Sequence, residues 1–169
     1  MIKTSASRHA LTLTLALAFG AAAAPALSGP KEIVVSSDSA VVEMSQDLDR
    51  QLDLTARQLR ENHGDGYAIV RFARGENGRP ANVSFYRRSG SPSVDRLART
   101  AVRRLGGQDG LPDTGVAGQT YQANIVLANS EESARKLTAD LARAEKQRLA
   151  SSLAERTVLA LSAGARIAS

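Results

Sequence analysis

The strongest constraint on the fold is a pair of alternating runs on either side of an Asn-Gly dipeptide. The first run spans residues 67–74 and the second spans 81–87, and in each run apolar side chains at alternate positions share one face. Asn77-Gly78 lies between the runs and favours a tight hairpin, because both residues tolerate positive φ. The pattern predicts a β-hairpin with one buried face.

An amphipathic helix is predicted directly after the hairpin. Ser91 can cap it, and Pro92 suits the first helical position, where no backbone N–H is needed. Apolar residues then recur at steps of three and four, which is the spacing of one helix face. They are Val94, Leu97, Ala98, Ala101, Val102 and Leu105. Gly106-Gly107 ends the helix, and we expect Leu97 and Val102 to pack against the apolar face of the hairpin.

A second amphipathic helix is predicted before the hairpin. Its apolar residues recur at helical spacing over 46–61, and Ser45 is its predicted N-cap. Residues 27–45 read as a linker or arm, in which 33–35 and 41–42 form short strands or ordered segments. The folded domain is therefore expected to begin at residue 46.

One strand and one long helix are predicted after the second glycine pair. Residues 120–127 alternate again, with Tyr121 and the apolar residues at every second position after it on one face. From Ser130 to Leu161 the chain is rich in Ala, Leu, Glu, Lys and Arg, which favours a helix, and its end is expected to fray near Ala163-Gly164. The prediction is an α+β domain over 46–129, a hairpin and a third antiparallel strand packed on helices, with a long C-terminal helix over 130–169.

The first residues have the pattern of a secretory signal peptide. Lys3 and Arg8 precede a charge-free apolar stretch over 10–27 with an Ala-rich exit, which predicts a signal peptide over 1–26. Cleavage is expected after Ala23 or Ala26, since a cut after residue 24 would place a proline directly behind the scissile bond. The alternative is an uncleaved membrane anchor, because the apolar stretch is near the lower length limit for a bilayer span.

The sequence carries no recognisable catalytic, cofactor or metal motif. It has no cysteine, which excludes thiol catalysis and cysteine-ligated zinc. His63 is the only histidine after the leader, and we interpret it as a solvated residue of a Gly-rich turn and not as a catalytic one. Residues 47–49 and 62–66 resemble fragments of calcium loops but lack the ligand spacing and the closing glutamate. We therefore expect a protein that is not an enzyme and holds no cofactor or metal.

Five arginines lie along one side of the helix after the hairpin or just before that helix. They are Arg87, Arg88, Arg96, Arg99 and Arg103. They form either the solvated face of an amphipathic helix or a docking patch for acidic partners or anionic envelope polymers, which Arg143, Lys146 and Arg148 would extend. The formal charge is +5, of which Lys3 and Arg8 account for two, leaving +3 (5 − 2) after cleavage. This balance does not favour nucleic acid as a partner.

Several short motifs in the middle of the chain occur in a known order. They are Gly66-Tyr67-Ala68-Ile69-Val70-Arg71-Phe72, Asn77-Gly78-Arg79, Asn82-Val83-Ser84-Phe85, Ser89-Gly90-Ser91-Pro92, Val94-Asp95, Ala101-Val102 and Leu111-Pro112. In this order they resemble the TonB C-terminal domain, most specifically from Gly66 to Ala101. The Tyr-Pro pair before the first strand and the long Pro-rich spacer of that family are absent. The resemblance implies either an energy transducer or a periplasmic relative that keeps only the domain.

The resemblance also implies a function. It predicts a periplasmic binding module that contacts a periplasmic or outer-membrane protein and contributes to TonB-dependent transport across the cell envelope. The strand over 119–127 would lie at an edge of the sheet and accept a partner segment as a further strand, which assigns partner binding to Thr120, Gln122 and Asn124. The alternative is that the C-terminal helix covers this edge.

Two alternatives concern role and location. If the domain has no part in transport, the expected role is that of an accessory or structural periplasmic protein that acts through its C-terminal helix and its arginines. If the N-terminal segment stays uncleaved, the expected location is the inner membrane, with the domain facing the periplasm.

Overall fold

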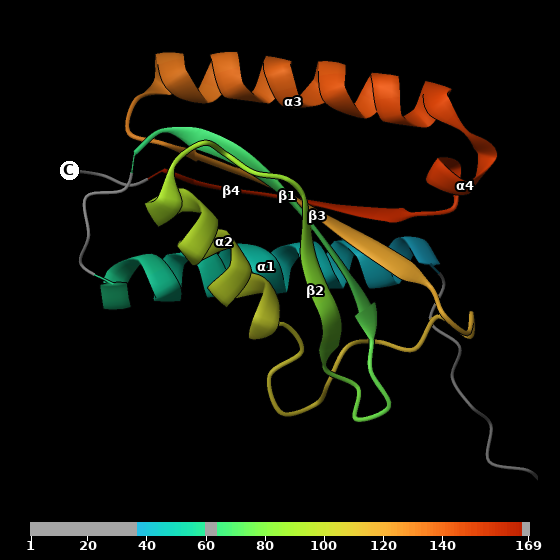
Figure 1. The fold of residues 1–169 in the computed structure, drawn as a ribbon. Coiled ribbons are helices and arrows are strands. Elements are labelled where there is room, and N and C mark those ends of the chain that lie inside the picture. Colours follow the sequence, from blue (N-terminus) through green and yellow to red (C-terminus); the bar gives the residue numbers. More distant parts are fainter. Residues whose placement is uncertain (1–36, 60–63, 167–169) are drawn as a thin grey trace, which may run out of the picture. The chain divides into compact units, whose positions relative to one another are not determined.

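The computed structural model describes residues 37–59 and 64–166. In chain order the elements are α1 (Ser37–Leu59), β1 (Gly66–Arg74), β2 (Pro80–Arg87), α2 (Pro92–Arg103), β3 (Thr120–Ala128), α3 (Glu131–Ser151), α4 (Leu153–Arg156) and β4 (Leu159–Arg166). Figure 1 labels them along the chain. The predicted signal peptide, the predicted strand at 33–35 and His63 lie outside the described residues. The fold class is α+β, as predicted.

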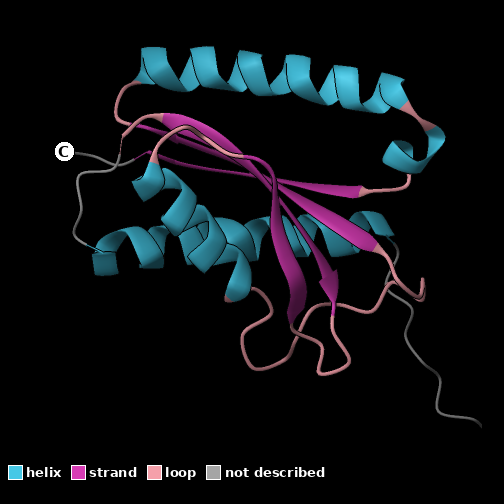
Figure 2. Cartoon of the chain, in the orientation of Figure 1, coloured by secondary structure: helices cyan, strands magenta, loops and turns pink. Residues whose placement is uncertain are grey.

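The sheet has four strands in the order β2-β1-β3-β4. β1 pairs antiparallel with both β2 and β3, whereas β3 and β4 run parallel, so the sheet is mixed (Figure 2). The predicted hairpin is confirmed, and its turn closes where the Gly75 N–H donates to the Arg79 carbonyl at 2.8 Å. Gly78 has a φ of 73°, the positive value that the Asn-Gly pattern anticipates.

One face of the sheet packs on α1 and α2 and forms the main core. Leu97 and Val102 of α2 are fully buried there together with Val70, Phe72 and other residues of the sheet, as predicted. Pro92 begins α2, and Ser91 precedes it at the N-cap position, but the Ser91 side chain makes no cap hydrogen bond. The opposite face carries a smaller apolar cluster, in which Leu141 of α3 packs on Tyr67, Ile69 and Val126.

The first helix is longer than the sequence pattern predicts. α1 begins at Ser37 instead of residue 46, and it includes 41–42, so the strand expected there is wrong and Ser45 lies inside the helix. Ala40 and Met44 are buried in line with Leu48 and Leu52, which extends the same apolar stripe by two helical turns. That burial stabilises a helix where a linker was expected.

The C-terminal segment differs most from the prediction. α3 starts as expected, since the Ser130 side chain accepts from the Ser133 N–H at 3.1 Å, but it ends at Ser151. Ser152 is extended and caps α4, and the chain then enters β4, which contains the predicted frayed end. β4 lies beside β3, and Leu161 is completely buried in the main core. A continuous helix to residue 161 is therefore wrong, because a buried strand replaces its last part.

Candidate functional site: an arginine-lined pocket

The strand assigned to partner binding does not lie at an edge. β3 is flanked by β1 on one side and by β4 on the other, so the predicted edge position is wrong. Gln122 is fully buried and Asn124 is 3 % exposed, whereas Thr120 at the start of the strand is half-buried. β4 occupies the position that an added strand would take, and the polar side chains of β3 are covered instead of exposed.

The buried polar side chains of β3 belong to an internal hydrogen-bond network. The Gln122 Nε2 donates to the Asn124 side-chain oxygen at 3.0 Å and to the Glu145 carboxylate of α3 at 2.6 Å. The Gln122 side-chain oxygen accepts from the Arg71 Nε at 3.2 Å. These bonds satisfy polar groups that would otherwise be costly to bury, so the alternation of β3 reflects a two-sided buried strand.

Arg148 connects this network to the C-terminal elements. It is 4 % exposed, and its guanidinium donates to the Glu145 carboxylate at 2.9 Å and to the Glu155 carboxylate at 3.4 Å. The Arg71 guanidinium also donates to Glu155, and this hydrogen bond is the main reason that the pKa of Glu155 lies below its ordinary value. Arg148 thus links α3 to α4 through ion pairs, and it does not extend the predicted docking patch.

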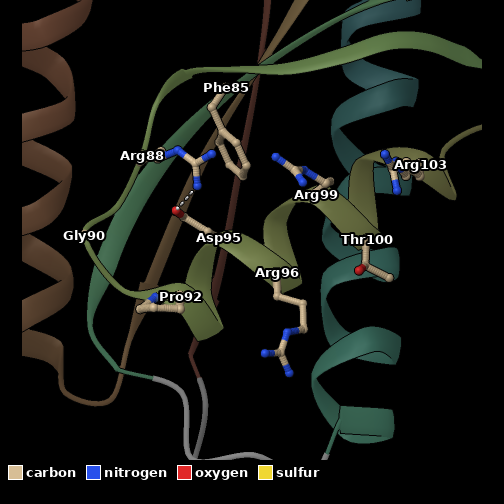
Figure 3. A pocket seen from close by; sticks show the side chains of 9 residues that line it. All are labelled: Phe85, Arg88, Gly90, Pro92, Asp95, Arg96, Arg99, Thr100 and Arg103. Atoms are coloured by element: carbon tan, nitrogen blue, oxygen red, sulfur yellow. Dashed lines mark hydrogen bonds and ion pairs between the residues drawn. The ribbon is translucent and has the colours of Figure 1, made fainter.

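A separate cavity of about 510 Å³ lies between the end of β2 and α2. Its walls are Phe85, Arg88, Gly90, Pro92, Asp95, Arg96, Arg99, Thr100 and Arg103 (Figure 3). Four of the five arginines that the sequence places in a docking patch therefore line one cavity. The volume is within the range typical of ligand sites, roughly 300–1,000 Å³. We call this cavity the arginine pocket.

Two of these arginines are held against an aromatic ring. The guanidinium carbon of Arg99 is 4.7 Å from the centre of the Phe85 ring, and that of Arg88 is 5.0 Å from it. Figure 3 shows the two guanidinium groups on opposite sides of the ring. Stacking on a ring face orients a guanidinium while leaving its in-plane N–H groups available for an anion. Among the described side chains, the Arg99 Nε is buried without a hydrogen-bond partner.

The pocket contains one carboxylate, and that group is already engaged. The Asp95 Oδ1 accepts from the Ser89 N–H and from the Ser89 hydroxyl, each at 2.8 Å, which fixes the connection between β2 and α2. Its other oxygen is 3.5 Å from Arg88. Within the described part of the chain, Arg99 and Arg103 form no ion pair. Four guanidinium groups against one carboxylate leave the pocket strongly cationic.

Arg87 lies on the other side of the sheet. Its guanidinium carbon is 4.7 Å from the centre of the Tyr67 ring, and it lines a cavity of about 240 Å³ with Asp140 and Arg143 of α3. The register between β1 and β2 shifts between Ile69 and Val70, which pair with Arg87 and Phe85 respectively. The extra residue, Tyr86, inverts the alternation, so Arg87 shares the face of Ile69 rather than that of Phe85.

Phe85 is the pocket residue that sequence reasoning missed. Its place in the alternating run predicts a core residue, and it does pack partly on the core while one side remains in the pocket. The available signal was its position at the end of a strand, two residues before a pair of arginines.

No protein-family model, curated protein or solved structure matches this chain. None of the described helices combines the length and the hydropathy that a bilayer span requires. Over the same described residues, no three His, Asp or Glu side chains gather in a way that would hold a metal ion. The arginine pocket is accordingly the candidate site, on its geometry and charge.

Proposed function

We propose that this chain is an exported, non-catalytic binding module of the cell envelope that holds an acidic segment of a partner protein in the arginine pocket. One observation carries the proposal. Four arginines from α2 and the end of β2 line one cavity in which the single carboxylate, that of Asp95, is already bonded to Ser89. A cavity with this excess of fixed positive charge favours an anionic ligand.

The cation type favours carboxylates over a membrane surface. Every cation of the pocket is an arginine, whose planar fork pairs with carboxylate oxygens in a two-point geometry. The arginines face a concave space, and two are oriented by Phe85. A lipid surface is instead recognised by a broad basic face or a flexible basic segment. The pocket therefore suits a protein segment with a few acidic side chains.

The location and the wider role are part of the proposal. The leader-like residues 1–26 support export to the periplasm, and the motifs from Gly66 to Ala101 support kinship with the TonB C-terminal domain. On this proposal the chain contributes to TonB-dependent transport by contacting an envelope protein. The contact is at the arginine pocket, because β3 is an interior strand. Mass spectrometry of the envelope protein tests export, and a chain that still begins at Met1 would favour the inner-membrane alternative.

A second candidate is an accessory role through the C-terminal helices. Leu149 is 44 % exposed and Leu153 is 77 % exposed, at the junction of α3 and α4. Exposed leucines in this position favour an apolar contact that does not involve the arginine pocket. A Leu153→Ser variant separates the two candidates, since it would release a partner bound at α4 and leave one bound at the pocket.

The experiment measures binding of a fluorescein-labelled glutamate-rich peptide by fluorescence anisotropy. The R96Q/R103Q double variant is expected to weaken binding at least tenfold, since removing close charge pairs typically costs one or more kcal/mol. The matched control is R135Q/K136Q, which removes the same charge from exposed positions of α3 outside both cavities and is expected to change affinity less than about threefold.

Two further measurements complete the test. Replacing the peptide's glutamates with glutamines should abolish binding, and vesicles of anionic lipid should bind more weakly than the peptide. Unchanged affinity in R96Q/R103Q would refute the pocket as the binding site.

A further inference from the structure

The proposed function leaves one arginine unexplained. Arg87 is exposed, and it forms no ion pair with any described residue. It nevertheless stacks over Tyr67 as Arg88 stacks over Phe85. Two adjacent arginines thus present oriented guanidinium groups to opposite faces of the sheet.

The strand that ends at Arg87, directly before Arg88, has a free side. β2 is an outer strand of the sheet, and within the described region no group outside the sheet bonds to the backbone of residues 81–87. The other outer strand, β4, is partly closed, because the Gly164 N–H donates to the Asp49 carboxylate of α1 at 3.0 Å. A ligand chain can therefore pass around the end of β2 from one face to the other.

The same end of β2 carries a fourth arginine–aromatic contact. The Arg71 guanidinium carbon is 3.8 Å from the centre of the exposed Tyr86 ring. Tyr86 is the extra residue of the bulge that sends Arg87 and Arg88 to opposite faces. The bulge also makes the edge irregular, which disfavours simple pairing with an added strand. Side-chain charge contacts on both faces are the mode of binding that this edge permits.

We infer that the partner segment carries two acidic clusters and straddles the end of β2, with one cluster in the arginine pocket and the other at Arg87. The inference rests on the proposed function and defines its partner more closely. The second cavity is smaller, about 240 Å³, and its Arg143 is paired with Asp140, so it is the weaker of the two subsites. Binding at the pocket then raises the effective concentration of the second cluster at Arg87.

The geometry sets the length of the spacer between the clusters. A path around one strand, from one face of a sheet to the other, is on the order of 15 Å, given layers spaced about 10 Å apart. An extended chain covers about 3.3 Å per residue, so a spacer of roughly five residues suffices. A shorter spacer cannot reach both subsites, and a much longer one lowers the effective concentration.

The test compares three labelled peptides by fluorescence anisotropy. One carries a single cluster of four glutamates, one carries two such clusters joined by about five Gly and Ser residues, and one has the same length as the second but four glutamines in place of its second cluster. The split peptide is expected to bind wild-type protein at least about tenfold more tightly than the glutamine peptide.

Variants then assign the gain to Arg87. R87Q is expected to remove the tenfold gain and to leave the single-cluster affinity unchanged. R79Q, which removes a charge from the exposed turn before the same strand, is the matched control and should keep the gain. Equal affinities for the split and glutamine peptides, or a gain that survives in R87Q, would overturn the inference while leaving the pocket intact. If the single-cluster peptide does not bind at all, the proposed function itself fails.

Discussion

Replacing Arg148 with methionine should destabilise the fold more than any other change of a single charged side chain on α3. Arg148 is 4 % exposed, and it donates to carboxylates of both Glu145 and Glu155. The R148M variant keeps much of the side-chain volume but leaves the Glu145 carboxylate without a cation and the Glu155 carboxylate with Arg71 alone. Breaking a buried ion pair in this way typically costs 3–5 kcal/mol. Both carboxylate side chains are partly exposed, 17 % for Glu145 and 20 % for Glu155, so we expect the lower end, about 3 kcal/mol.

Urea unfolding followed by far-ultraviolet circular dichroism measures this loss, because the chain contains no tryptophan for fluorescence. The control is R143M on the same helix, whose guanidinium is exposed and pairs with Asp140 at the surface. It should change the free energy of unfolding by less than about 0.5 kcal/mol. If the free energy of unfolding of R148M lies within about 0.5 kcal/mol of that of the wild type, the network does not stabilise the packing of α3 on the sheet.

Two further predictions concern the core and pH. Leu97→Ala should lower the free energy of unfolding by about 2–5 kcal/mol in the same assay, because Leu97 is fully buried between α2 and the sheet. A loss below about 0.5 kcal/mol would mean that α2 does not pack there. The pKa of Glu155 lies below its ordinary value, mainly because Arg71 donates a hydrogen bond to its carboxylate. The charged form therefore stabilises the fold at pH values above the ordinary pKa, and this stabilisation is lost as the pH falls through the lowered pKa. The stability difference between wild type and Glu155→Gln should therefore shrink from pH 7 to pH 3, and a difference that stays constant would rule out this linkage.

The parts of the fold that the sequence predicts are those with a local signal. The hairpin follows from alternation around Asn77-Gly78, and α2 follows from Pro92 and an unbroken apolar stripe. β4 has no comparable signal, because Ala, Leu, Ser and Arg are compatible with a helix and the strand is stabilised by pairing with β3. Leu161 and Ala163 are buried at alternate positions of β4. In the sequence this period of two extends over only a few residues, too few to predict a strand.

The role of β3 could not be read from alternation alone. Polar residues at every second position indicate a solvated face when nothing covers that face, and the sequence did not reveal the cover. Gln122 and Asn124 are buried under α3, where Gln122 donates to Glu145 of that helix and to the Asn124 side chain. Their polarity thus reports a partner within the chain instead of one outside it.

The candidate site depends on a single irregularity of the sheet. The sequence predicts one patch of five arginines from the helical spacing of Arg96, Arg99 and Arg103 and from the position of Arg87 and Arg88 just before them. Strict alternation would place Arg87 on the same face as Phe85. The bulge at Tyr86 moves Arg87 to the α3 face and aligns Arg88 with Phe85, so the cluster divides into a pocket and a second subsite. A change of register by one residue cannot be inferred from composition, yet it separates Arg87 from the four arginines that line the pocket.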